Sequence, residues 1–77
     1  MRLTTEQMTE LRNYCKSHIS NFDSFVSIAL DEMDEMRIPL EMCSCSLSEK
    51  LWSCFEDWCE DKKLNPYDID IEMDELI

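Results

Sequence analysis

Hydrophobic residues recur at intervals of three and four along much of the chain, a spacing that predicts amphipathic helices. The first helix is expected from Thr5 to about Ser20. Thr4 and Gln7 have the spacing of a capping box, in which each side chain bonds to the backbone N–H of the other residue. The apolar face of this helix carries Met8, Leu11, Tyr14, Cys15, His18 and Ile19.

A second helix is expected with Asp23 as its N-cap, because a carboxylate there can accept a bond from an unpaired backbone N–H. It should end near Arg37, since Pro39 disfavours helical geometry at the residue before it. The third helix is expected after Ser46, which forms another capping box with Glu49, and should run to about Lys62.

Two short segments alternate between hydrophobic and polar residues, a pattern that favours extended strands. They are residues 38–42 and residues 68–74. Pairing of the two would give a helix-dominated α+β domain, with three amphipathic helices and a two-stranded ribbon in the order ααβαβ. The alternative is a three-helix bundle with an acidic C-terminal tail. No linker or repeat divides the chain, so residues 1–77 are expected to form a single small acidic domain.

The charge balance limits the classes of partner. The 77 residues include 18 Asp+Glu and 7 Lys+Arg, which gives a net charge of -11. So few cations argue against direct binding of DNA or RNA through their phosphates. Glycine is absent from the sequence, which excludes phosphate-binding loops built on glycine. No apolar run is long enough to span a membrane, and no secretory signal opens the chain, so a cytoplasmic protein is expected.

Most acids fall where a helix or strand would expose them. Opposite the apolar faces of the second and third helices, and along the C-terminal segment, the candidate partner-binding acids are Asp31, Glu32, Asp34, Glu35, Glu56, Asp57, Glu60, Asp61, Asp68, Asp70, Glu72 and Asp74. The last four would lie on one strand face about 6.6 Å apart, a spacing near that of successive phosphates along one nucleic-acid strand. They could therefore occupy a basic groove that normally holds nucleic acid. A solvated face that only supplies solubility is the common alternative.

Two hydrophobic residues lie at the border of the acidic faces. Trp52 is placed between the apolar and acidic sides of the third helix, and Ile28 is placed among the acids of the second. Tryptophan is enriched at the centres of protein interfaces, and an apolar residue inside a charged rim has the same arrangement. Both are therefore candidate contact residues, although a partly buried core aromatic and a scattered surface residue are the simpler interpretations.

The five cysteines raise the question of a metal site. Cys43, Cys45, Cys54 and Cys59 could supply four thiolates to zinc, but their spacing differs from the familiar zinc motifs. Cysteines on an apolar helix face are more often buried packing residues. The sequence therefore predicts no cofactor and no metal, with a small zinc-binding module as the third functional hypothesis.

No cluster of nucleophile, base and oxyanion donors is recognisable, so an enzyme is not expected. In size, charge and absence of catalytic motifs, the chain is similar to small phage-encoded inhibitors of the anti-CRISPR or anti-restriction type. That resemblance implies a non-enzymatic inhibitor that blocks a basic nucleic-acid-binding protein by imitating nucleic acid. The alternative is an accessory or assembly subunit that associates with itself or with a partner through an apolar seam.

Overall fold

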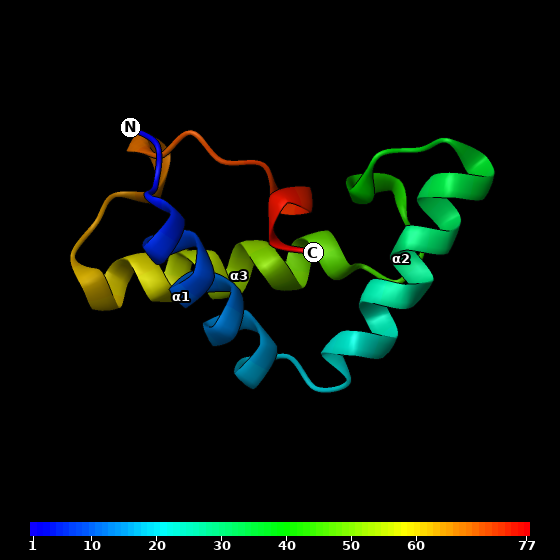
Figure 1. Cartoon of the computed structure of the whole chain (residues 1–77), viewed down its shortest axis with the longest axis horizontal. Coiled ribbons are helices and arrows are strands. Elements are labelled where there is room, and N and C mark those ends of the chain that lie inside the picture. Colours follow the sequence, from blue (N-terminus) through cyan, green and yellow to red (C-terminus); the bar gives the residue numbers. More distant parts are fainter.

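The computed structural model describes all 77 residues and contains three α-helices, three short 3₁₀ helices and no strand. The α-helices are α1 (Thr5–His18), α2 (Phe22–Met36) and α3 (Leu47–Lys62), and the 3₁₀ helices are η1 (Leu40–Met42), η2 (Pro66–Asp68) and η3 (Met73–Leu76). Figure 1 shows α1 lying across α3, with α2 standing apart beside the other end of α3. The helix-dominated class is confirmed, but the ribbon is wrong, and the three-helix alternative fits better.

Helix α3 is the centre of the fold because every other helix of the chain packs against it. Seven of its sixteen residues are buried, Trp58 and Phe55 being the largest. Helix α1 packs against it through Leu11 and Cys15, both fully buried. In α2, by contrast, only Phe22 and Ala29 are buried. None of the helices is long and apolar enough to cross a lipid bilayer.

One predicted helix start and one predicted capping box differ from the structure. The capping box of Thr4 and Gln7 is confirmed. Helix α2, however, begins at Phe22 after a left-handed Asn21, one residue before the predicted N-cap. This earlier start buries the Phe22 ring, and asparagine tolerates the left-handed conformation. Ser46 is also left-handed and makes no capping bond, so the second predicted capping box is wrong.

The chain reverses direction without glycine. Asn21, Arg37, Ser46 and Lys63 all have φ between 52° and 60°, in the left-handed region that glycine normally occupies. At Lys63 the reversal is a Schellman motif: the backbone N–H of Leu64 donates to the Cys59 carbonyl at 2.8 Å, and that of Lys63 donates to the Glu60 carbonyl at 3.1 Å. Each such residue with a Cβ carries a steric cost, which the surrounding packing offsets.

Residues 38–42 do not form the predicted strand, because their backbone turns within η1, where the N–H of Met42 donates to the Pro39 carbonyl at 3.0 Å. The residues that follow bond to α2. The Cys43 thiol donates to the Ala29 carbonyl at 3.7 Å, and the Cys45 thiol donates to the Phe25 carbonyl at 3.9 Å. Leu40 turns inward within η1 and is buried. The loop is therefore fixed along one side of α2 and has no edge to offer to the C-terminal segment.

The C-terminal segment is extended only over residues 69–72, between η2 and η3. Its buried residues are Ile69, Met73 and Leu76, a spacing of four and three that a continuous strand would not give. Its extended part pairs with the start of the chain: the Asp70 N–H donates to the Met1 carbonyl at 2.7 Å, and the terminal amine of Met1 donates to the Asp68 carbonyl at 2.9 Å. The predicted tail is thus an integral part of the core.

Candidate acidic interaction surface

Most of the basic side chains are engaged within the fold. Arg2 pairs with Glu75 at 2.9 Å, Lys16 with Asp23 at 3.9 Å, and Lys62 with Glu10. Two more are held by other contacts: Arg12 donates to the Glu75 carbonyl at 3.0 Å, and the ammonium of Lys50 lies 4.7 Å from the centre of the Phe25 ring. Only Arg37 and Lys63 of the seven bases make none of these contacts.

Two of the twelve predicted acids also have a structural role. Glu32 accepts bonds from the Ser44 hydroxyl at 2.5 Å and from the Ser44 N–H at 2.9 Å, which fastens residues 43–45 to α2. These bonds stabilise the carboxylate and lower the pKa of Glu32. The Asp70 carboxylate lies 3.6 Å from the terminal amine of Met1. The remaining ten are exposed and form no ion pair: Asp31, Asp34, Glu35, Glu56, Asp57, Glu60, Asp61, Asp68, Glu72 and Asp74.

On α2 the unpaired acids gather at the C-terminal half of the helix. Asp31 and Glu35 are four residues apart and therefore lie side by side on one face, where like charges repel. No basic residue occupies the last turn to balance the negative end of the helix dipole. Ile28 lies on the same face and is 45% exposed, as the sequence pattern predicted.

Helix α3 repeats this arrangement. Glu56 and Glu60, and likewise Asp57 and Asp61, are neighbours four residues apart over the last two turns. The only base in the last turn is Lys62, and its ammonium is paired with Glu10 of α1. Trp52, on the same helix, is 39% exposed and makes an edge-to-face contact with Phe55 at 5.6 Å between ring centroids.

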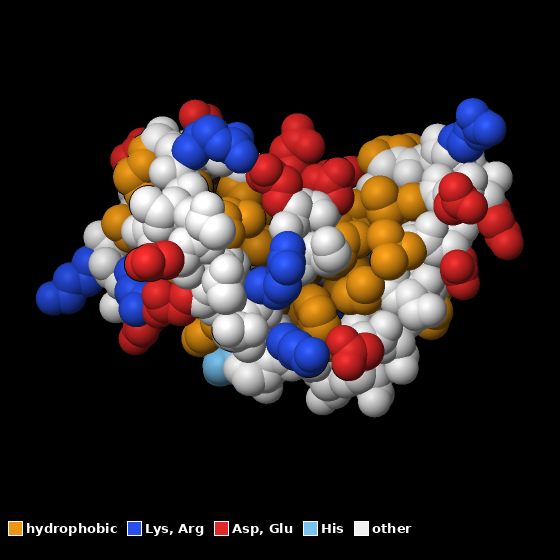
Figure 2. All heavy atoms as spheres, in the orientation of Figure 1, with side chains coloured by type: hydrophobic (Ala, Val, Ile, Leu, Met, Phe, Trp, Pro, Cys, Tyr) orange, Lys and Arg blue, Asp and Glu red, His pale blue; other side chains and the backbone are white.

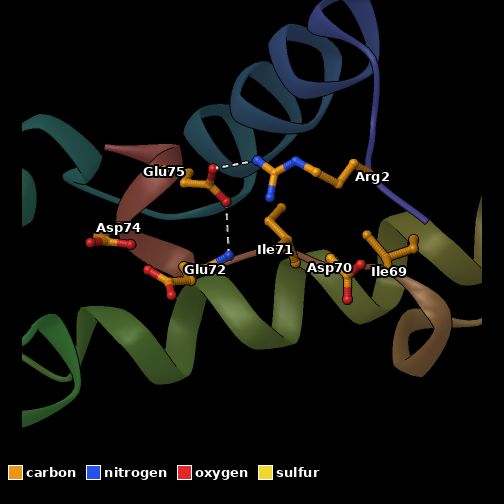
Figure 3. Close-up of a pocket in the computed structure, with 7 residues that line it drawn as sticks. All are labelled: Arg2, Ile69, Asp70, Ile71, Glu72, Asp74 and Glu75. Atoms are coloured by element: carbon orange, nitrogen blue, oxygen red, sulfur yellow. Dashed lines mark hydrogen bonds and ion pairs between the residues drawn. The ribbon is translucent and has the colours of Figure 1, made fainter.

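The C-terminal acids border a shallow hollow of about 630 Å³, lined by Arg2, Ile69, Asp70, Ile71, Glu72, Asp74 and Glu75. Figure 3 shows Glu75 turned toward Arg2, while Asp74 points away from that pair. The other oxygen of Glu75 accepts the backbone N–H of Glu72 at 2.9 Å, and these bonds lower the pKa of Glu75. Glu75 therefore caps the N-terminus of η3 through its bond with Glu72, and it also holds the side chain of Arg2.

The predicted row of four carboxylates does not form. Asp68 lies in η2 and Asp74 in η3, so only Asp70 and Glu72 are on extended backbone. The regular spacing that would imitate phosphates requires a strand over the whole segment. Glu75 and Arg2 were missed as lining residues; Glu75 belongs to the same acidic run, whereas no local pattern could relate Arg2 to a residue 73 positions away.

The acidic groups occupy separate areas instead of one continuous patch. Figure 2 shows acidic side chains over the C-terminal turn and others along the outer edge of α2, with a hydrophobic area between them. The structure thus brings Asp70, Glu72 and Asp74 to one hollow, while the acids of α2 and α3 are carried by helices that pack at different ends of the core.

The four cysteines considered for zinc do not converge. Cys43 and Cys45 face carbonyls of α2, whereas Cys54 and Cys59 are buried in the core along α3. Burial raises the pKa of Cys15 to about 12, so this thiol stays protonated at neutral pH. No three His, Cys, Asp or Glu side chains are placed to hold a metal ion together.

Comparisons with protein-family models, with curated protein sequences and with solved structures found no match for this chain. We therefore infer its function from the charges, contacts and exposed side chains of the chain itself.

Proposed function

We propose that this chain is a non-enzymatic binding protein that attaches to a basic, nucleic-acid-binding protein and thereby blocks it, using the ten unpaired candidate acids of α2, α3 and the C-terminal segment. The observation that carries the proposal is the pairing of charges: five of the seven bases are engaged inside the fold, while ten of the twelve candidate acids are exposed and have no ion pair.

The positions of these acids support the proposal further. Acids near the C-terminus of a helix oppose the helix dipole, and like charges four residues apart repel each other. Glu35 of α2 and Asp61 of α3 lie in the last turns of their helices, and each has a like charge four residues earlier, at Asp31 and Asp57. Lysine or arginine side chains of a partner would relieve both unfavourable terms upon binding. Such complementarity also accelerates association and makes the affinity sensitive to salt.

Affinity capture from the source organism's lysate tests the proposal. The wild-type chain is the bait, beside a variant with Asp57→Asn, Glu60→Gln and Asp61→Asn. The control variant carries Glu6→Gln, Glu41→Gln and Glu49→Gln, which changes the net charge equally at exposed acids outside the proposed surface. We expect the wild type and the control to retain a basic protein that the α3 variant loses. The nucleic acid of that protein should compete with the chain for it.

Two results would contradict the proposal. In the first, the α3 variant and the control retain the same proteins equally, which would mean that these acids make no specific contact. In the second, the captured protein still binds its nucleic acid at saturating concentrations of the chain, so that no blocking occurs.

The accessory-subunit alternative requires an apolar seam. The extended segments that were expected to supply it by strand addition are not strands. The exposed apolar surface of the fold lies on α2 instead, and its geometry gives the inference below.

A further inference from the structure

One side of α2 is apolar but has little covering it. Val26, Leu30 and Met33 follow one another at intervals of four and three, so they lie in a row on one face of the helix. We call these three residues the α2 strip. Leu30 is 48% exposed, and Val26 and Met33 are only partly buried against the core. Figure 2 shows a continuous hydrophobic area over this part of the molecule, beside the C-terminal turn.

Leu30, in the middle of the strip, is exposed because the loop after α2 covers a different side of the helix. Residues 43–45 bond to Phe25, Ala29 and Glu32, which lie on the side of the helix turned away from Leu30. The apolar arc of α2 is therefore wider than the surface that packs on it. A half-exposed leucine with apolar neighbours above and below has the arrangement of a binding surface rather than that of a single scattered residue.

The charges around the strip restrict what can cover it. Asp34 follows Leu30 by one helical turn and forms no ion pair, and α2 contains no base. Its acids Asp31, Glu32 and Glu35 lie on other sides of the helix. Lys16 of α1, near the start of α2, is already paired with Asp23. A second copy of this chain would bring the same acids to the same rim, and an anionic membrane surface would also be repelled. The complementary surface is apolar in the centre and basic at its edges.

We propose that the α2 strip binds an amphipathic basic helix of the partner, an inference that rests on the proposed function and specifies the element recognised. The strip spans about 10 Å along α2, from the helical rise over seven residues, which matches two turns of a bound helix. Such a helix would present apolar side chains at intervals of three and four, with lysine or arginine on either side. The flexible thioether of Met33 can adapt its shape to the bound residue.

A synthetic peptide tests the inference directly. The probe is a dye-labelled helix of about 14 leucine and lysine residues with apolar positions at i, i+3, i+4 and i+7. The reference is a peptide of the same composition with the order scrambled, so that its charge is equal but it has no apolar face. Fluorescence anisotropy measures both affinities for the full chain. We expect the amphipathic peptide to bind at least about tenfold more tightly.

Two variants of α2 form a matched pair for the same assay. Leu30→Ser shortens the strip, whereas Ile28→Ser removes a residue of similar exposure, 45% against 48%, from the other face of the helix. We expect Leu30→Ser to weaken binding of the amphipathic peptide by about five- to tenfold, since roughly half of a leucine side chain becomes unavailable for burial. Ile28→Ser should weaken binding less than Leu30→Ser, because Ile28 lies outside the strip, and an equal loss for the two variants would overturn the inference. If Leu30→Ser disturbs the fold, Val26→Thr takes its place in the assay, because it keeps the shape of the side chain and should also weaken binding.

Failure of this inference can be distinguished from failure of the proposed function. If the scrambled and amphipathic peptides bind equally and both weaken when the α3 acids are neutralised, the acids bind bases but the strip has no role, and the inference is wrong. If sedimentation shows a dimer that Leu30→Ser dissociates, a second copy covers the strip, and the inference is again wrong. If neither peptide binds, the inference is wrong, whereas the proposed function is decided by the capture experiment.

Discussion

The acids at the end of α3 should reduce the stability of the free protein, and this can be measured. The change is the triple variant Asp57→Asn, Glu60→Gln and Asp61→Asn. In the folded protein Asp57 neighbours Glu60 and Asp61 on the helix surface, Glu60 also neighbours Glu56, and the only base in the last turn is engaged with α1. Neutralising the three acids therefore removes several repulsive contacts at once.

The expected gain can be worked out from these positions. The triple variant removes three like-charge pairs at i,i+3 or i,i+4, each unfavourable by about 0.2–0.5 kcal/mol. It also removes two carboxylates, Glu60 and Asp61, from the last turn, where each opposes the helix dipole by about 0.3–1 kcal/mol. The free energy of unfolding should rise by about 1–3 kcal/mol at low salt. For a domain of this size, even the lower limit raises Tm by about 4–8 °C.

Urea unfolding followed by circular dichroism measures this gain at about 0.02 M and about 0.5 M NaCl. Salt screens exposed charges, so the advantage of the variant should shrink at the higher concentration. Glu49→Gln is the matched control, because Glu49 lies in the first turn of the same helix, where a negative charge is favourable. It should lower the stability slightly. Equal stability of triple variant and wild type, or a gain that salt does not reduce, would refute the reasoning.

Three other measurements test features of the fold. Lys63→Gly should raise the free energy of unfolding by about 0.5–1 kcal/mol, because glycine removes the left-handed strain at a modest entropic cost, whereas Lys63→Ala, which keeps the Cβ, should give no gain in the same urea assay. Glu32→Gln should destabilise the protein at neutral pH, because the charged carboxylate accepts bonds from Ser44. Folding lowers the pKa of Glu32, so the stability that the carboxylate contributes is present above the ordinary carboxyl range and is lost as the pH falls below it. The urea curves of variant and wild type should therefore converge in acid, and a constant difference would contradict the role of Ser44. In native protein at pH 8, iodoacetamide should modify the half-buried Cys45 well before the fully buried Cys15, as measured by mass spectrometry of peptides. Equal rates for the two cysteines would mean that the packing of α1 on α3 opens readily.

The helices could be predicted from the sequence because their signals are local. The side chains that form the capping box of Thr4 and Gln7 are three residues apart, and the apolar spacing of α3 leads to Lys62, where the helix ends. The exposure of Ile28 and Trp52 also followed from helical periodicity, which places each residue relative to its own neighbours. Charge and its distribution along the chain were equally evident, since they need no fold.

The strand predictions failed because contacts with residues distant in the sequence outweighed the local alternation of hydrophobic and polar residues. The alternation at 68–74 predicts a strand, but the backbone N–H of Asp70 donates to the Met1 carbonyl, and Met73 and Leu76 are buried in the core, so the segment turns. Residues 38–42 likewise have a weak strand pattern, but their backbone turns within η1, and bonds from Cys43 and Ser44 to α2 hold the residues that follow as a loop.

The candidate site shows the same division. That the protein is acidic, and that α2 and α3 carry acids opposite their apolar faces, was determined by the sequence through composition and helical period. Only the tertiary structure decided which charges stay unpaired, because ion pairs such as Lys62 with Glu10 join residues of different helices. It also decided that Leu30 remains exposed, since the apolar arc of a helix says which residues prefer burial, whereas the packing of the other elements determines how much of that arc is covered.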